Sequence, residues 1–167
     1  MIYYSVGTPI GKLNDNAQRY VYRQSQLFSM SVDAFSIWTR FLHGADVDAA
    51  YDRFKGKIER EAYQQIVNAL IDTEMLLSEE QLKHAYCLRQ GYGIGIGAST
   101  GESAIFCGSV CHVSYRAFLF WTYCDGQTTV ENILLNIHSQ TETVFSYQHA
   151  VSDIQELINR SLILIVN

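Results

Sequence analysis

A serine between two glycines in the second half of the chain has the spacing of a catalytic nucleophile. Gly97-Ala-Ser99-Thr-Gly101 matches the elbow of some hydrolases, in which the serine stands on a sharp turn between a strand and a helix. The residues after Gly101 have the pattern of a second strand, which favours a hairpin turn over an elbow. No histidine and carboxylate can be assigned to Ser99 from the sequence, so we predict no catalytic residue and no enzymatic activity.

Just before this stretch, glycine occupies every second position from Gly91 to Gly97. A dinucleotide-binding loop also has closely spaced glycines, but it opens directly into a helix, and no helix pattern follows here. Strict alternation predicts instead a strand with one bare face, with Tyr92, Ile94 and Ile96 on its other face. We expect a neighbouring aromatic side chain to cover the bare face.

Metal binding is a third kind of chemistry that the second half could support, through Cys107, Cys111 and His112. A zinc-finger site would need a second Cys/His pair at a matching spacing, and the sequence offers none. A turn at Gly108-Ser109 would also separate the two cysteines. We therefore predict no metal and no cofactor, and we expect the cysteines to be buried apolar side chains in the reducing cytoplasm.

The composition narrows the class of protein. The chain has 167 residues, 48% hydrophobic and 17% charged, with a formal net charge of −5. This length fits two small domains of about 80 residues each. An acidic balance disfavours nucleic acid as a partner. No run reaches the roughly 18 apolar residues that a membrane span needs, so we expect no membrane partner.

An internal repeat indicates how the chain is organised. Ala34-Phe35 and Trp38-Thr39 in the first half have counterparts, Ala117-Phe118 and Trp121-Thr122, in the second. In both halves a serine precedes this helical pattern and a glycine follows it, as at the start and end of a helix. We therefore predict an α+β protein of two tandem winged-helix-like modules, residues 1–77 and 91–167, joined by a linking helix and segment over 78–90.

Each module is predicted to contain strands, then three helices, then a final strand. In the first module these are a hairpin over 19–23 and 26–30, helices over 31–44, 45–54 and 59–72, and an apolar strand over 74–77. In the second they are strands over 91–97, 103–107 and 109–113, helices starting after Ser114, Thr128 or Thr129, and Ser146, and a terminal strand over 162–166. Between the modules, Ser78 and Gln81 match a capping box.

The second module also carries a pattern found in a known family. An apolar helix ends at Cys124, Asp125-Gly126 and Thr129-Val130 follow, and Ile133 precedes a third helix that ends in an apolar stretch. Over residues 103–166 this pattern resembles PqqD-like proteins. These are small winged-helix domains, many of which recognise precursor peptides in the biosynthesis of ribosomally made, modified peptides. The first module matches less closely. The resemblance implies that a leader peptide adds as a strand to the small sheet and lies against the third helix.

The edge of a small sheet has unpaired N–H and C=O groups that an extended peptide can satisfy. Together with the resemblance, this leads us to expect a non-catalytic accessory protein that presents a precursor peptide to a peptide-modifying enzyme. The predicted contact residues are Ile105, Phe106, Val110, Tyr147, Ala150, Val151 and Ile154 in the second module, and Leu27, Tyr63 and Val67 in the first. An edge blocked by the sister module, or by the partner in a homodimer, is the alternative.

A winged-helix transcription regulator is the second functional hypothesis. The third helix of the first module and the segment before it would contact phosphates and base edges. The residues concerned are Lys55, Lys57, Arg60, Gln64 and Asn68. Glu59 and Glu61 interrupt this set, so a solvated helix face is the simpler explanation. A structural adaptor that binds another protein without strand addition is a third possibility.

Overall fold

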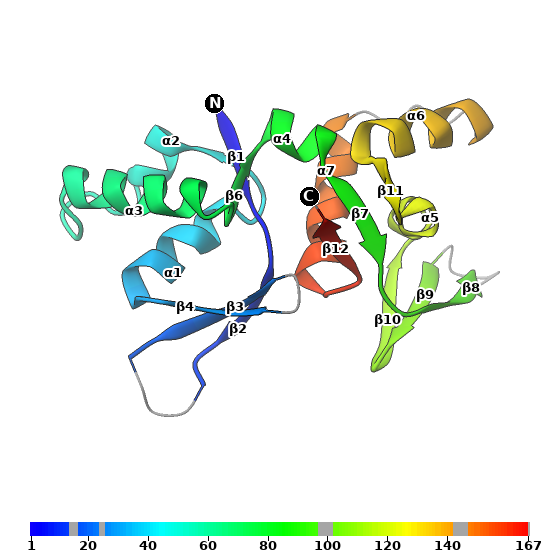
Figure 1. Cartoon of the computed structure of the whole chain (residues 1–167), viewed down its shortest axis with the longest axis horizontal. Helices are drawn as coiled ribbons and strands as arrows, with labels where there is room; N and C mark the ends of the chain where they lie inside the picture. Colours follow the sequence, from blue (N-terminus) through cyan, green and yellow to red (C-terminus); the bar gives the residue numbers. More distant parts are fainter. Residues whose placement is uncertain (14–16, 24–25, 97–101, 142–146, 167) are drawn as a thin grey trace. The chain divides into compact units, whose positions relative to one another are not determined.

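The structure divides into two compact units, Met1–Leu82 (unit 1) and Lys83–Asn167 (unit 2). It is a computed structural model that describes residues 1–13, 17–23, 26–96, 102–141 and 147–166, and Figure 1 labels its elements. Each unit combines helices with small antiparallel sheets, so the predicted α+β class is confirmed.

The first sheet of unit 1 joins the beginning, the middle and the end of that unit. Strand β1 (Ile2–Ser5) lies between β5 (Ala45–Asp46) and β6 (Leu76–Ser78), and both pairings are antiparallel. The backbone N–H of Val6, just after β1, also donates to the carbonyl of Met75, at 3.1 Å. These long-range pairings close unit 1 into one body.

The second sheet of unit 1 has the order β2-β3-β4. Its strands are β2 (Thr8–Gly11), β3 (Arg19–Arg23) and β4 (Gln26–Met30). The register runs from Arg19 opposite Met30 to Arg23 opposite Gln26, so the predicted hairpin is confirmed. Among the residues that the structure describes, β4 pairs with β3 alone and is therefore an edge strand.

The helices of unit 1 are α1 (Val32–Trp38), α2 (Val47–Tyr51), α3 (Arg60–Asp72) and α4 (Glu79–His84), with a short 3-10 turn η1 (Thr39–Phe41). Side-chain caps start helices α1 and α2, whereas α3 begins after Glu59 without a side-chain cap. The Ser31 hydroxyl accepts the backbone N–H of Ala34 at 3.1 Å at the start of α1. The Asp46 carboxylate accepts the N–H of Asp48 at 3.0 Å at the start of α2. Each cap satisfies a backbone donor that the helix itself leaves unpaired.

The predicted capping box at the start of α4 is also confirmed. Ser78 N–H donates to the Gln81 side-chain oxygen at 2.8 Å, and Gln81 N–H donates to the Ser78 hydroxyl at 3.2 Å.

The core of unit 1 is built largely from fully buried aromatic and aliphatic side chains. The bulkiest of them are Trp38, Tyr63, Phe41, Ile37 and Met75.

Unit 2 repeats the element order of unit 1. Its first sheet has β7 (Tyr86–Arg89) between β11 (Asp125–Thr129) and β12 (Ile163–Val166). Its second sheet consists of β8 (Tyr92–Ile96), β9 (Glu102–Cys107) and β10 (Ser109–Ser114), with β9 in the centre. Its helices are α5 (Tyr115–Tyr123), α6 (Val130–Thr141) and α7 (Tyr147–Asn159).

The same tryptophan hydrogen bond also occurs within each of the two units. The Trp38 indole N–H donates to the carbonyl of Met75 at 3.1 Å, and the Trp121 indole N–H donates to the carbonyl of Leu162 at the same distance. A non-glycine residue with a positive φ precedes each acceptor, Glu74 at 54° and Ser161 at 55°. The repeated tryptophan that indicated a duplication in the sequence therefore has the same role in both units.

Three sequence-based expectations need correction. Each module has two small sheets rather than one. The predicted linking segment 78–90 contains α4 but also β7, which is the central strand of a unit 2 sheet. Gly126, expected only to follow the end of a helix, lies in β11, which runs from Asp125 to Thr129. The predicted cap Ser146 lies outside the described residues.

Candidate functional site

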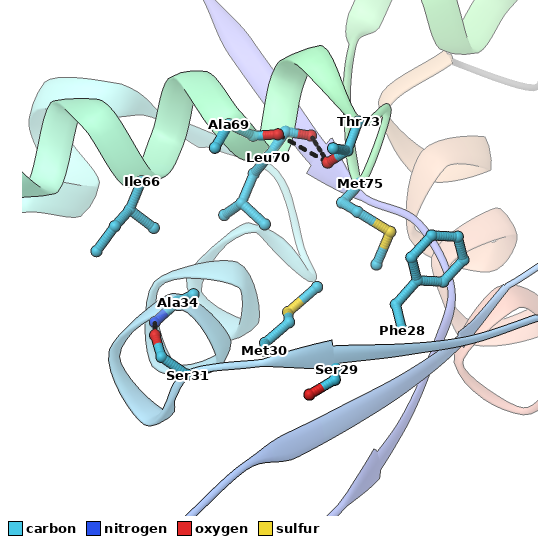
Figure 2. A pocket seen from close by; sticks show the side chains of 10 residues that line it. All are labelled: Phe28, Ser29, Met30, Ser31, Ala34, Ile66, Ala69, Leu70, Thr73 and Met75. Atoms are coloured by element: carbon cyan, nitrogen blue, oxygen red, sulfur yellow. Dashed lines mark hydrogen bonds between the residues drawn. The ribbon is translucent and has the colours of Figure 1, made fainter.

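A groove in unit 1 runs between the edge strand β4 and helix α3. It encloses a cavity of about 300 Å³. Figure 2 shows side chains from α3 along one wall and β4 along the other, with the start of α1 beside them. The local sequence explains this position, because β4 leads directly through the Ser31 cap into α1, and α1 packs against α3.

None of the side chains that line this groove carries a charge. The α3 wall presents Ile66, Ala69 and Leu70. Met30 lies across from this wall, and Met75 lies at its end. The short side chains at Ala69 and Ala34 leave the space that the cavity occupies. Such a surface favours apolar side chains over charged ones, because a charge placed there would lose hydration without finding a partner.

Two hydroxyl groups in the groove, those of Ser31 and Thr73, already have local partners. Thr73 at the end of α3 donates its hydroxyl to the carbonyl of Ala69 at 2.7 Å, and the Ser31 hydroxyl caps α1. Strand β4 contributes further hydrogen-bonding groups to this wall through the Ser29 hydroxyl and its own backbone. Alternate residues of an edge strand turn their N–H and C=O groups away from the sheet, and Ser29 and its neighbours on β4 form one wall of the groove.

The structure places the predicted peptide-contact residues of unit 1 differently from our expectation. Tyr63 and Val67 are fully buried in the core, so they support α3 from below and cannot touch a peptide on its outer side. Leu27 is 51% exposed but is absent from the groove lining, because its neighbours Phe28 and Met30 point to that side of β4. Ile66 and Ala69 recur at helical spacing in the sequence, and this pattern is the signal that could have indicated the groove wall.

The predicted contact residues of unit 2 divide in the same way. Phe106 and Val110 are exposed and lie directly opposite each other on β9 and β10. The other predicted side chains whose burial is described are core residues: Ile105, Ala150, Val151 and Ile154. These four are therefore removed from the predicted contact surface. The side chain of Tyr147 lies outside the described part of the structure.

The residues of the DNA-binding hypothesis mostly have partners within unit 1. Arg60 pairs with Asp48 and lies 4.5 Å above the Tyr51 ring, and the Lys55 ammonium lies 2.6 Å from the Asp52 carboxylate. The Asp52 carboxylate raises the pKa of Lys55 by hydrogen bonding and charge attraction.

Two further residues of that set bond to each other, since the Gln64 amide donates to the Asn68 side-chain oxygen at 3.0 Å. Lys57 is exposed. Four of the five side chains thus make small local contacts, and the set does not form a single cationic surface.

The stretches that suggested chemistry have structural roles where they are described. Gly93 lies on β8, and a Cβ there would be 3.1 Å from Phe118 Cζ and 3.3 Å from Trp121 Cζ3, so the predicted aromatic cover is confirmed. Cys107 ends β9 and Cys111 lies on β10, with the predicted turn at Gly108 between them. Cys107 is exposed and Cys111 is half-buried, so the expectation of buried cysteines is wrong for these two. The segment Gly97–Gly101, which holds Ser99, lies outside the described residues.

The other two cysteines, Cys87 and Cys124, are buried in unit 2. Burial, together with the neighbouring Cys87, raises the pKa of the Cys124 thiol well above its ordinary value. Within the described ranges, no group of three or more His, Cys, Asp and Glu side chains could hold a metal ion. In the same ranges, no helix has both the length and the apolar character needed to cross a bilayer.

Comparison with known proteins identifies no family. No protein-family model matches the sequence, and no curated protein matches it. Among solved structures, PKMT2 from Rickettsia typhi is similar to this chain with a TM-score of 0.35 and 11% sequence identity. The match covers 98% of this chain, which spans 42% of the length of that protein. A similarity this weak supports neither a shared fold nor a shared function.

Proposed function

We propose that this chain is a non-catalytic peptide-binding protein, in which an extended peptide adds as a strand to β4 and lies against α3. The observation that carries the proposal is an edge strand beside an uncharged groove. The unpaired backbone of β4 would provide main-chain hydrogen bonds, and the groove lined by Ile66, Leu70 and Met75 would receive apolar side chains. The backbone hydrogen bonds would provide affinity, and the groove would provide specificity for the side chains of the peptide.

The cellular role that we propose is presentation of a precursor peptide to a modifying enzyme. It rests on the resemblance of residues 103–166 in unit 2 to PqqD-like proteins and on the same element order in unit 1, whose edge strand lies beside a helix as the binding mode of that family implies. The partner set therefore consists of a peptide and a peptide-modifying enzyme, and it contains no nucleic acid.

Strand addition can be tested without knowing the natural peptide. The full chain is used to select from a phage library of random twelve-residue peptides, and an enriched peptide is synthesised with a fluorophore for polarisation measurements. N-methylation is then placed at each residue in turn. Strand addition predicts that methylation weakens binding at alternate residues only, since every second N–H of an added strand points to its neighbour.

Two measurements separate this proposal from its competitors. Ile66→Asp should abolish peptide binding, whereas Gln65→Asp places the same charge on the exposed side of α3 and should leave binding unchanged. Affinity should also change little between 50 and 300 mM salt, in contrast to the steep dependence of a DNA-binding surface. A selection that enriches no peptide, or one whose peptides tolerate methylation everywhere, would refute strand addition.

A further inference from the structure

The two units can be compared residue by residue at the groove. Helices α3 and α7 each span 13 residues, and each is followed at the same distance by the positive-φ residue and the tryptophan-bound carbonyl described above. This alignment pairs Thr73 with Arg160, Ala69 with Glu156 and Ile66 with Asp153. Every pair replaces an uncharged groove residue of unit 1 by a charged residue of unit 2.

The edge strands align equally well through the serine caps that follow them. Ser31 caps α1 and Ser114 caps α5, each by accepting the N–H of the third residue along at 3.1 Å. Ser29 on β4 therefore corresponds to His112 on β10. In the described residues β10 pairs with β9 alone, so it is the edge strand of its sheet, as β4 is in unit 1.

In unit 2 an arginine occupies the backbone of that edge. Arg160, just after α7, donates from Nη1 to the carbonyl of His112 at 2.8 Å. Its other terminal nitrogen pairs with the Glu156 carboxylate at 2.9 Å. The guanidinium N–H thus lies where the N–H of an added strand would have to lie. In unit 1 the equivalent Thr73 is too short for this contact and bonds back to its own helix.

A second ion pair joins the helices on either side of the same region. Arg116 of α5 makes two hydrogen bonds to Asp153 of α7, one of them 3.0 Å long between Nη2 and Oδ1. The Asp153 side chain is only 8% exposed. The equivalent pair in unit 1 is Asp33 and Ile66, which can form no ion pair, and Ile66 lines the open groove instead.

From these contacts we infer that unit 1 alone receives the peptide, and that Arg160 closes the equivalent edge of unit 2. The inference rests on the proposed function and names the working site within it. The occupant is one extended peptide per chain, with uncharged apolar residues facing α3. A strand that approached β10 would have to displace a charge-assisted hydrogen bond, whereas a strand approaching β4 meets an uncharged groove.

The first test moves the arginine into unit 1. Thr73→Arg should weaken binding of the selected fluorescent peptide at least tenfold, because the new side chain can reach the β4 edge. The substitution is compatible with folding, since unit 2 folds with arginine at this position and a cation is favourable at a helix C-terminus. Gln65→Arg, which places the same cation on the exposed side of α3 and outside the groove lining, should keep binding within twofold. Hydrogen exchange with the unmodified chain should show peptide protection at residues 26–30 and none at 109–114.

The second test opens unit 2. A chain with Thr73→Arg should enrich no peptide from the random library, and adding Arg160→Thr and Glu156→Ala to it should restore enrichment, with protection now at 109–114. Protection at 109–114 in the unmodified chain, unchanged binding with Thr73→Arg, or no enrichment after the added substitutions would each overturn the inference while strand addition stands. Failure of the unmodified chain to enrich any peptide would instead remove the proposed function, and this inference with it.

Discussion

Replacing Gly91 by alanine tests how closely the chain at Gly91 approaches strand β9. Gly91 follows β7 and has a φ of +83°, a region that alanine enters at a cost of about 1–2 kcal/mol. An added Cβ would also lie 2.4 Å from the carbonyl oxygen of Phe106 and 3.0 Å from Cys107 Cβ, well inside van der Waals contact. Because the nearest atom belongs to the backbone, relief requires movement of the whole of β9.

Gly108 provides a matched control in the same sheet. Its φ is +74°, but a Cβ there would meet nothing within 4 Å. The backbone cost is therefore common to both substitutions, and the difference between them isolates the steric contact. We expect Gly108→Ala to lower the free energy of unfolding by about 1–2 kcal/mol. Gly91→Ala should lower it by a further amount of about 1–3 kcal/mol, the usual cost of overpacking.

Urea unfolding followed by fluorine NMR would measure this difference. The chain has two tryptophans, one in each unit, so labelling with 5-fluorotryptophan gives Trp121 as a reporter of unit 2 and Trp38 as a reporter of unit 1. Stabilities come from the transition midpoints and slopes of the Trp121 resonance. Equal losses for Gly91→Ala and Gly108→Ala would refute the close approach of β9 to Gly91.

Four other substitutions test three features that shape the two units. Arg116→Ala should destabilise unit 2 by about 2–4 kcal/mol, because it leaves the charge of Asp153, whose side chain is 8% exposed, buried without its partner. Asp153→Ala should cost less, because the Arg116 side chain is 38% exposed and its charge can be hydrated; the opposite ranking in urea unfolding would contradict the assigned burial. Ser114→Ala should cost about 1 kcal/mol through loss of the α5 cap, measured by the same method, and no loss would show that the cap is dispensable. Burial raises the pKa of Tyr63 from 10.0 to about 12, so the stability that its neutral form provides is complete below pH 10 and is lost as the pH rises through about 12. Tyr63→Phe should therefore flatten the loss of stability in this window, and an unchanged alkaline melting profile would count against the raised pKa.

Sequence reasoning was most successful where the signal is local. Ser31, Asp46 and Ser114 each precede a helical pattern, and each caps its helix. The capping box at Ser78 and Gln81 forms in both directions. A cap depends on residues within one turn, so its signature lies within a few positions of the sequence.

The contacts that escaped prediction join distant parts of the chain. Strand β5 has two residues and no strand pattern of its own, and it exists because Ala45 and Asp46 lie opposite Tyr3 and Ile2 on β1. Arg160 meets the carbonyl of His112 across 48 positions. Nothing near Arg160 in the sequence distinguishes it from a solvated residue at a helix end. The difference between the edge strands of the two units could therefore be seen only in the structure.

The pairing of the first and last strands in each unit has a consequence for how a gene that encodes such a unit can be duplicated or permuted. Tyr3 near the start of unit 1 lies opposite Ser78 near its end, and Tyr86 lies opposite Val166 in unit 2. The polypeptide thus arrives at and departs from each body at neighbouring points. A gene segment that encodes one body could be copied in tandem, or have its ends rejoined and be reopened elsewhere, without breaking any strand order. Two such copies are then free to diverge, and here they differ at positions in the groove lining of unit 1 where unit 2 has charged side chains.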